Sequence, residues 1–182
     1  MVSQIKVNEI IKQSGSSISI GESGDTINLA GSAYAVAGTN TPSFFAKLSA
    51  NQSIPNTAWT LITLNATDWD TDSAFNTSTN RFVVPSAKAG KYVFSFSVGT
   101  SPDWEIGERL IAKLYINGAS QDKSVIDNRA AANSQDMFVN NTITFNLSVN
   151  DYVQLYCYHN EGASQNVLAN HVFLTGYKLI GA

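Results

Sequence analysis

The 182-residue sequence has little of what covalent cross-linking or charge-driven binding requires. Its one cysteine, Cys157, has no second cysteine in the chain to pair with, and its place between two tyrosines predicts a small buried residue on a strand. Charged residues make up 14% of the chain, the formal net charge is -3 and the pI is about 5.2. We therefore expect no basic surface of the kind that binds nucleic acid or an anionic membrane.

Long apolar runs are also missing. Residues 1–10, MVSQIKVNEI, contain no apolar stretch of signal-peptide length, and no segment is long and apolar enough to cross a membrane. The sequence therefore predicts neither a signal peptide nor membrane insertion.

Catalytic motifs are absent as well. Only two histidines occur, His159 and His171, and there is no G-x-S-x-G, no H-E-x-x-H and no phosphate-binding glycine loop. Two histidines that meet in a fold can bind a metal, but no third ligand is indicated, and ordinary strand positions are the alternative for both. Because no nucleophile can be paired with an acid and a base, the sequence predicts a protein that is not an enzyme.

Three aspartates raise the question of calcium. Asp68, Asp70 and Asp72 have the spacing that opens a calcium-binding loop. The helix-flanked form of that loop is excluded, because Ser73 stands where it needs glycine and Thr79 where it needs an acidic residue. Calcium bound by aspartates in a loop of a β-protein stays open as an alternative, and no cofactor is otherwise indicated.

What the chain does have is regular alternation of apolar and polar residues. In FVVPSAKAGKYVFSF, residues 82–96, the rings of Tyr92, Phe94 and Phe96 share one face of a predicted strand, and Pro85 and Gly90 predict a corner before it. A buried aromatic side chain removes roughly 150–250 Å² from water. We therefore expect the two strands of this stretch to organise the core.

The same period of two recurs along the rest of the chain. Further strands are predicted at Phe44–Leu48, Trp59–Leu64, Arg109–Ile116, Met137–Leu147, Tyr152–His159 and Val167–Ile180, with a short partner strand at Ser124–Ile126. Polar loops are predicted at Asp68–Asn80, which contains Trp69, and around Trp104. About eight to ten strands and no helix predict an all-β antiparallel jelly-roll sandwich.

Residues 1–42 differ from the rest of the chain, because their predicted strands are too short to stand alone and are separated by glycines. The apolar residues of these strands are Ile5, Val7, Ile18, Ile20, Ile27 and Leu29. We expect a β-rich stem that pairs with the same segment of neighbouring chains, with a flexible tail as the alternative. A linker at Ala35–Thr41 then leads into a domain of residues 43–182.

A set of short motifs in residues 43–182 carries a family resemblance. They are FVVP at 82–85 followed by GKYVFSF at 90–96, WDTDSAFNTSTNRF before them, and then LYING, LSVNDYVQLYCY and VFLTGYKLI. Together they resemble the complement globular-head family, within the tumour-necrosis-factor-like jelly rolls. The resemblance implies a compact homotrimer with sheet faces packed around a threefold axis. The family usually has fewer residues between the proline and the glycine than Ser86–Ala89, so a longer corner is expected.

A homotrimer can hide a sheet face that a monomer must cover, which offers a place for the many aromatic residues. The candidate residues of the trimer interface or the core are Tyr92, Phe94, Phe96, Tyr156, Tyr158, Phe173 and Tyr177. For each of these rings the sandwich core is the alternative to the interface.

The N-terminal segment directs the functional hypothesis. QIKVNEIIKQSGSSISIGESGDTINLAG resembles the start of tail fibres and other structural proteins of tailed bacteriophages, and it lacks the collagen-like Gly-X-Y repeat of animal heads. The resemblance implies a homotrimeric fibre, spike or capsid-decoration protein of the virion. Residues 1–42 would bind other virion proteins, and the head would face outward for stabilisation or for contact with a host receptor or glycan.

A free adhesin or lectin-like carbohydrate-binding module is the alternative function. In that case Trp69 and Trp104 are candidate ligand-contact rings in loops, where they would stack on sugars. Hydrophobic plugs beneath the loops are an equally good explanation of both residues. Removal of residues 1–42 separates the two functions, because a virion protein needs a docking segment and a free lectin does not.

Overall fold

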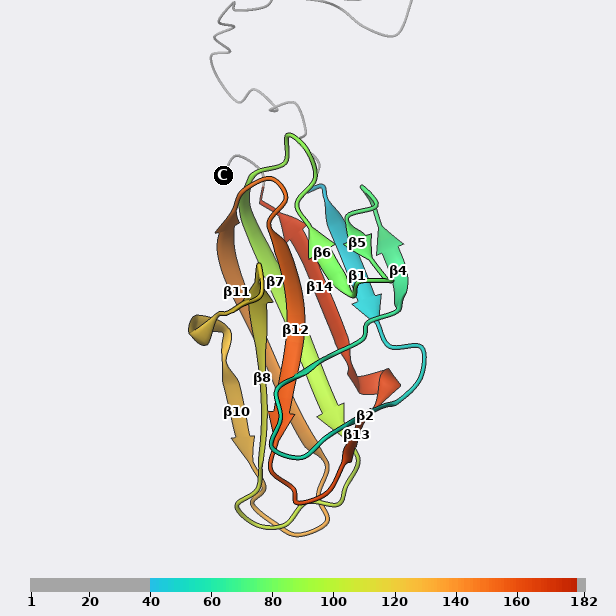
Figure 1. The fold of residues 1–182 in the computed structure, drawn as a ribbon, viewed down its shortest axis with the longest axis vertical. Coiled ribbons are helices and arrows are strands. Elements are labelled where there is room, and N and C mark those ends of the chain that lie inside the picture. Colours follow the sequence, from blue (N-terminus) through green and yellow to red (C-terminus); the bar gives the residue numbers. More distant parts are fainter. Residues whose placement is uncertain (1–39, 180–182) are drawn as a thin grey trace, which may run out of the picture. The chain divides into compact units, whose positions relative to one another are not determined.

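The computed structural model describes residues 40–179, called the head below, as two antiparallel β-sheets that pack face to face (Figure 1). Fourteen strands and two short 3-10 helices occur in these residues, and none of their helices is long and apolar enough to cross a membrane. The predicted all-β antiparallel jelly-roll sandwich is confirmed. The candidate anchor residues Ile5, Val7, Ile18, Ile20, Ile27 and Leu29 lie outside the described residues.

The first sheet, called sheet A, is built around two eleven-residue strands, β7 and β11, which pair along their whole length. On the other side of β7 lie β14, then β1 and β4, and the short strands β13 and β2 adjoin the last residue of β7. The bounds are β1 (Ser43–Lys47), β2 (Gln52–Ile54), β4 (Ala66–Asp70), β7 (Gly90–Thr100), β11 (Met137–Leu147), β13 (Gln165–Val167) and β14 (Phe173–Lys178).

The second sheet, called sheet B, has β12 at its centre with β8 and β10 on one side and β6 and β5 on the other. Two further short strands pair with it, β3 with β12 and β9 with β8. The bounds are β3 (Thr60–Leu61), β5 (Phe75–Asn76), β6 (Arg81–Val83), β8 (Arg109–Ile116), β9 (Ala119–Ser120), β10 (Ile126–Arg129) and β12 (Tyr152–His159). The 3-10 helices are η1 (Asp122–Ser124) and η2 (Ala169–His171).

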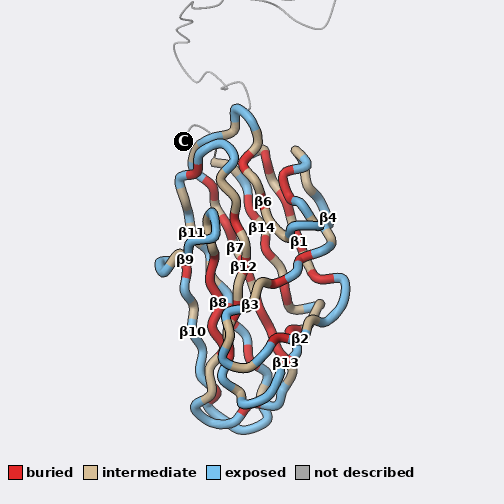
Figure 2. The backbone as a smooth tube through the Cα atoms, in the orientation of Figure 1, coloured by how far each residue is buried: buried red, intermediate tan, exposed pale blue. Residues whose placement is uncertain are grey.

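The core between the sheets follows from the period of two along the strands. Tyr92, Phe94 and Phe96 point inward from β7 and are at most 1% exposed. Phe44 on β1 and Phe82 on β6 stack with 5.0 Å between their ring centroids, and Phe82 meets Phe94 edge-on at 5.6 Å. Residues 82–96 therefore supply core rings to both sheets, and Figure 2 shows the alternation of buried and exposed positions that results.

Cys157 also points into the core, from β12, and is fully buried. Burial raises the pKa of its thiol well above the ordinary value, because the apolar surroundings disfavour the thiolate. The side chain is thus a small core residue rather than a nucleophile.

The polar loop predicted at Asp68–Asn80 is wrong in part, because strands occupy some of these residues. β4 extends to Asp70, and Phe75 lies on β5 with its side chain buried in the core. The Asp70 carboxylate accepts hydrogen bonds from the backbone N–H groups of Ala74 and Phe75, both at 2.9 Å, and so turns the chain from one strand into the next. The polar composition of residues 68–80 does not predict this turn, because the turn depends on hydrogen bonds accepted by a single side chain, that of Asp70.

The short partner strand predicted at Ser124–Ile126 is also displaced. Ser124 belongs to η1, where its hydroxyl accepts a hydrogen bond from the backbone N–H of Leu114, and β10 begins only at Ile126. The buried serine thus holds the helix against β8, and the strand that pairs with β8 follows it.

Candidate functional site

The seven rings predicted for the trimer interface or the core fall into three groups. Tyr92, Phe94 and Phe96 lie in the core, Phe173 and Tyr177 on the outer face of sheet A, and Tyr156 and Tyr158 on the outer face of sheet B. The head therefore has two outer faces that carry aromatic residues, and these faces are the candidate functional surfaces.

A row of rings crosses the outer face of sheet A. Phe45 on β1 lies between Trp69 on β4 and Phe173 on β14, with 5.1 Å between ring centroids on each side. Trp69 is 49% exposed, and Tyr177, further along β14, is 39% exposed. Trp69 thus stands on a strand rather than in the predicted loop, and its neighbours are rings of the same sheet. Because part of this row is open to water, this face of sheet A is a candidate contact surface.

Beside this row, the outer face of sheet A is hollowed over β7 and β11. The hollow has a volume of about 650 Å³, and the residues that line it include Ser95, Ser97, Asn140, Thr142 and Phe173. The hydroxyls of Ser95 and Thr142 share a 2.7 Å hydrogen bond across the two strands. None of the lining residues is charged. A protein surface that packs against the hollow would therefore need no charged side chains to pair with its lining.

The outer face of sheet B carries a second ring cluster, made of Trp59, Tyr115, Tyr156 and Tyr158. Trp59 lies 5.6 Å from Tyr158 and 6.5 Å from Tyr115, and Tyr115 lies 4.0 Å from Tyr156, all measured between ring centroids. Burial, then the nearby Tyr156 and Asp122, raise the pKa of the Tyr115 phenol above its ordinary value. This cluster is called the sheet B ring cluster below.

Sequence reasoning missed Trp59 and Tyr115 as members of a site. The available signal for Tyr115 was its phase in β8, because it alternates with the core residue Leu114 and so had to point away from the core. For Trp59 there was no comparable signal, since it precedes a two-residue strand whose alternation is too short to read.

Trp104 cannot serve as the ligand-contact ring considered from the sequence. Its side chain is 0% exposed, and its Nε1–H donates to the hydroxyl of Thr100 at 2.9 Å and to the carbonyl of Ser101 at 3.0 Å. The ring also meets His159 edge-on at 6.1 Å. Trp104 is therefore a hydrophobic plug beneath its loop, which was the alternative explanation.

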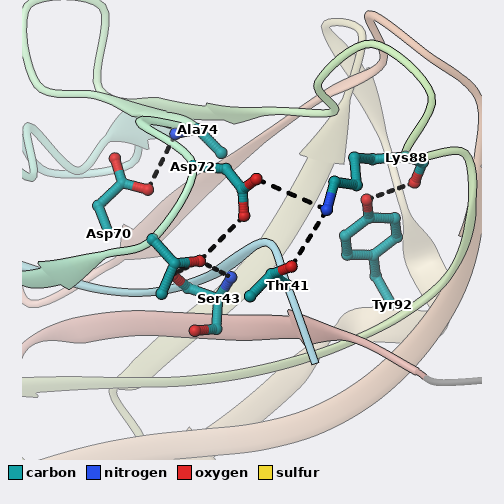
Figure 3. Close-up of polar contacts among 8 residues, drawn as sticks. Thr41, Ser43, Asp70, Asp72, Ala74, Lys88 and Tyr92 are labelled. Carbon is teal, nitrogen blue, oxygen red and sulfur yellow. Dashed lines mark hydrogen bonds and ion pairs between the residues drawn. The ribbon is translucent and has the colours of Figure 1, made fainter. Parts of the chain in front are cut away.

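The three aspartates considered for calcium have separate protein partners. Asp68 forms an ion pair with Lys47, Asp70 holds the turn into β5, and Asp72 lies 3.6 Å from the Nζ of Lys88 (Figure 3). The two histidines are engaged elsewhere, His159 in the core and His171 against the ring of Phe138. Among residues 40–179, no three His, Cys, Asp or Glu side chains are grouped so that they could hold a metal ion.

Lys88 joins the corner before β7 to the beginning of the head (Figure 3). Its Nζ lies 3.1 Å from the hydroxyl of Thr41 as well as near Asp72, and the backbone N–H of Ser43 donates to the hydroxyl of Thr71 at 3.0 Å. Lys88 in the corner thus contacts both Thr41, just before β1, and Asp72, just after β4.

Tyr92→Phe is expected to remove a fall in stability at alkaline pH. The Tyr92 hydroxyl donates to the carbonyl of Lys88 at 2.6 Å, and burial, with the charge of Asp72, raises the pKa of Tyr92 from 10.0 to about 12. In that window the folded state keeps a proton that the unfolded chain has released, so stability falls as pH rises. Urea denaturation between pH 10.0 and about pH 12 should show a steeper decline for wild type than for Tyr92→Phe. If the free energy of unfolding fell equally with pH in wild type and in Tyr92→Phe, the decline could not be assigned to Tyr92.

The order of the strands in its two sheets makes the head a jelly roll of the C1q and tumour-necrosis-factor type. Residues 43–179 match the family model of the C1q domain, and the chain therefore belongs to the C1q domain family. This is the complement globular-head family that the motifs of residues 43–182 resemble. No curated protein matches the chain.

Solved structures agree on the fold. The globular domain of zebrafish complement 1qA protein is 16% identical, with a TM-score of 0.54, over 76% of this chain and 97% of its own. Eiger TNF from S. frugiperda is 10% identical, with a TM-score of 0.57, over 77% and 92%. The PRD1 vertex protein P5 is 19% identical, with a TM-score of 0.52, over 75% and 94%. At such low identities these likenesses are evidence of a common fold. They are not evidence about activity.

Proposed function

We propose that this protein is a non-enzymatic structural protein of a bacteriophage virion that assembles as a homotrimer through the outer face of sheet A. The observation that carries the proposal is the partly exposed row of Trp69, Phe45 and Phe173 beside an uncharged hollow. Three copies packed by this face around a threefold axis would remove the rings from water. Homotrimers are typical of C1q and tumour-necrosis-factor heads, which supports the same arrangement.

The placement in a virion has two supports. The N-terminal segment resembles the start of bacteriophage fibre proteins, and one of the head's structural neighbours is a phage vertex protein. In this proposal the protein is a fibre, spike or capsid decoration. Residues 1–42 attach it to other virion proteins, and the head faces outward for particle stabilisation or host contact.

The trimer is tested by the solution mass of the full chain and of a chain that starts at Thr41, measured by light scattering during size exclusion. Two trimers would support an interface in the head and leave the N-terminal segment free for docking. A trimer of the full chain alone would place the interface in residues 1–40, and two monomers would refute the trimer. Immunogold labelling of purified particles with antibody to the head tests the virion placement, which absence of label would refute.

The second candidate is a free adhesin or lectin-like carbohydrate-binding module. The sheet B ring cluster favours it, because these rings lie on the face opposite to the proposed trimer interface and would stay exposed in the trimer. A free lectin should bind its sugar after removal of residues 1–42 and should be absent from purified particles. A virion protein should lose its attachment to the particle with the same truncation.

A further inference from the structure

The sheet B ring cluster has no role in the proposed trimer, and it needs an explanation of its own. Trp59 is 37% exposed, although the neighbouring rings of Tyr115 and Tyr158 pack against it. We propose that this cluster is a carbohydrate-binding platform, on which the C–H faces of β-1,4-linked hexopyranose rings stack on Trp59 and the adjoining tyrosines. The inference rests on the proposed outward-facing role of the head and specifies the host ligand that the head would contact.

Lys113 holds the platform in position from below. Its Nζ lies 4.1 Å from the ring centroid of Trp59, 5.5 Å from that of Tyr115 and 3.8 Å from the carboxylate of Asp122. Lys113 is only 9% exposed whereas Trp59 is 37% exposed, so the ammonium group is shielded from water while part of the indole stays open to it. A cation against an indole face stabilises its orientation. The ring is therefore positioned before a ligand arrives, which lowers the entropic cost of binding.

The charges near the cluster favour a neutral ligand. Lys113 is paired with Asp122, and Arg109, at the end of the same strand, is paired with Asp127. Binding of nucleic acid or of another polyanion needs cations that are free to replace counter-ions, and these cations are engaged. The platform therefore offers stacking area with little net charge, which suits a sugar without acidic groups.

The polar groups around the rings match the hydroxyls of a sugar. Tyr115, Tyr156 and Tyr158 combine an apolar ring with a phenol that can donate and accept hydrogen bonds. The side chain of Asp122 is 91% exposed and presents carboxylate oxygens as acceptors at the edge of the platform. A ligand with C–H groups on its faces and hydroxyls around its rim can use both kinds of surface, whereas an aliphatic protein surface would cover the phenols without offering them hydrogen-bond partners.

The test is saturation-transfer NMR and tryptophan fluorescence titration of the full-length protein with three β-1,4-linked probes: cellotetraose, mannotetraose and chitotetraose. We expect saturation transfer to the ring protons of at least one probe. Trp59→Ala should weaken binding of that probe by at least about tenfold, because the largest stacking surface is lost. Trp59→Phe, which keeps a ring, should weaken binding less.

Ile106→Ala is the control, because Ile106 is an exposed apolar residue in the loop between β7 and β8 and belongs neither to the sheet B ring cluster nor to the row of rings on sheet A. It should leave the affinity for the probe unchanged. The inference is overturned by absence of transfer to all three probes at millimolar concentration, or by equal binding of wild type and Trp59→Ala. Light scattering on the same samples reports the trimer separately. Loss of the trimer with intact sugar binding would refute the proposed assembly, and an intact trimer without sugar binding would refute the platform.

Discussion

A head that carries Thr142→Arg is expected to be a monomer. Thr142 lines the hollow of sheet A, and its side chain points away from the core, where its hydroxyl bonds to that of Ser95. Three copies packed around this hollow would bring three guanidinium groups into an interface whose lining has no carboxylate. Burial of unpaired charges costs far more than the interface hydrogen bonds would return. Light scattering of the chain that starts at Thr41 should therefore give one third of the mass of the wild-type head, since no N-terminal segment is present to hold the copies together.

The fold of the single head should survive this change. Thr142 is exposed in the head, and substitutions at such positions usually change stability by less than about 0.5 kcal/mol. Gln154→Arg is the matched control, because Gln154 lies on the outer face of sheet B, where its amide makes one long hydrogen bond to the carbonyl of Thr79 at 3.3 Å. This variant should remain a trimer. A trimeric Thr142→Arg protein would exclude the outer face of sheet A as the interface.

Phe94→Ala is expected to destabilise the head by about 3–5 kcal/mol, a large part of the roughly 5–15 kcal/mol that holds a domain together. Phe94 is fully buried and meets Phe82 from sheet B and Tyr92 from its own strand, so its removal leaves a cavity between the sheets. Urea denaturation should be measured in the monomeric Thr142→Arg background, because trimer formation makes apparent stability depend on concentration. A loss below about 1 kcal/mol would contradict the central place of this ring.

A substitution at Gly176 gives a second test of how tightly the sheet is packed around Phe94. A Cβ at this position would lie 2.7 Å from the Cδ1 of Phe94 and 2.9 Å from the carbonyl oxygen of Val93, so Gly176→Ala should also destabilise the head. Because Phe94→Ala removes the first of these clashes, the double variant should lose less than the sum of the two single losses. Tyr177→Ala, at the adjacent but outward position, should cost less than about 1 kcal/mol.

The long strands could be predicted closely from the sequence. Arg109–Ile116, Met137–Leu147 and Tyr152–His159 have the bounds that their alternation predicted, because eight to eleven residues with a period of two leave little freedom in where a strand begins. The short strands β2, β5 and β9 were not predicted, and β3 is only two residues of the strand predicted at Trp59–Leu64. The strand predicted at Val167–Ile180 is divided by η2 into the end of β13 and β14. Such short strands form where another strand of the sheet offers hydrogen-bonding partners, as β12 does for β3 and β8 for β9, and this is a property of the assembled sheet.

The candidate surfaces could be predicted only in part. The phase of Phe173 and Tyr177 in β14 placed them on one face of a strand, but the row on sheet A also needs Phe45 and Trp69, which arrive from distant parts of the chain. Trp104 shows the opposite case. It lies among polar residues in a loop, and its apolar ring can be buried without cost to its Nε1–H because Thr100 and Ser101 accept hydrogen bonds from that group.

The sequence by itself determined the all-β class, the family resemblance and which residues of a strand share a face. These follow from the backbone geometry of a strand, which alternates its side chains wherever the strand lies. Only the tertiary structure decided which outer face each ring belongs to, and that Lys113 lies beneath Trp59. Those contacts join residues far apart in the chain, and strand pairing and the packing of the two sheets bring them together.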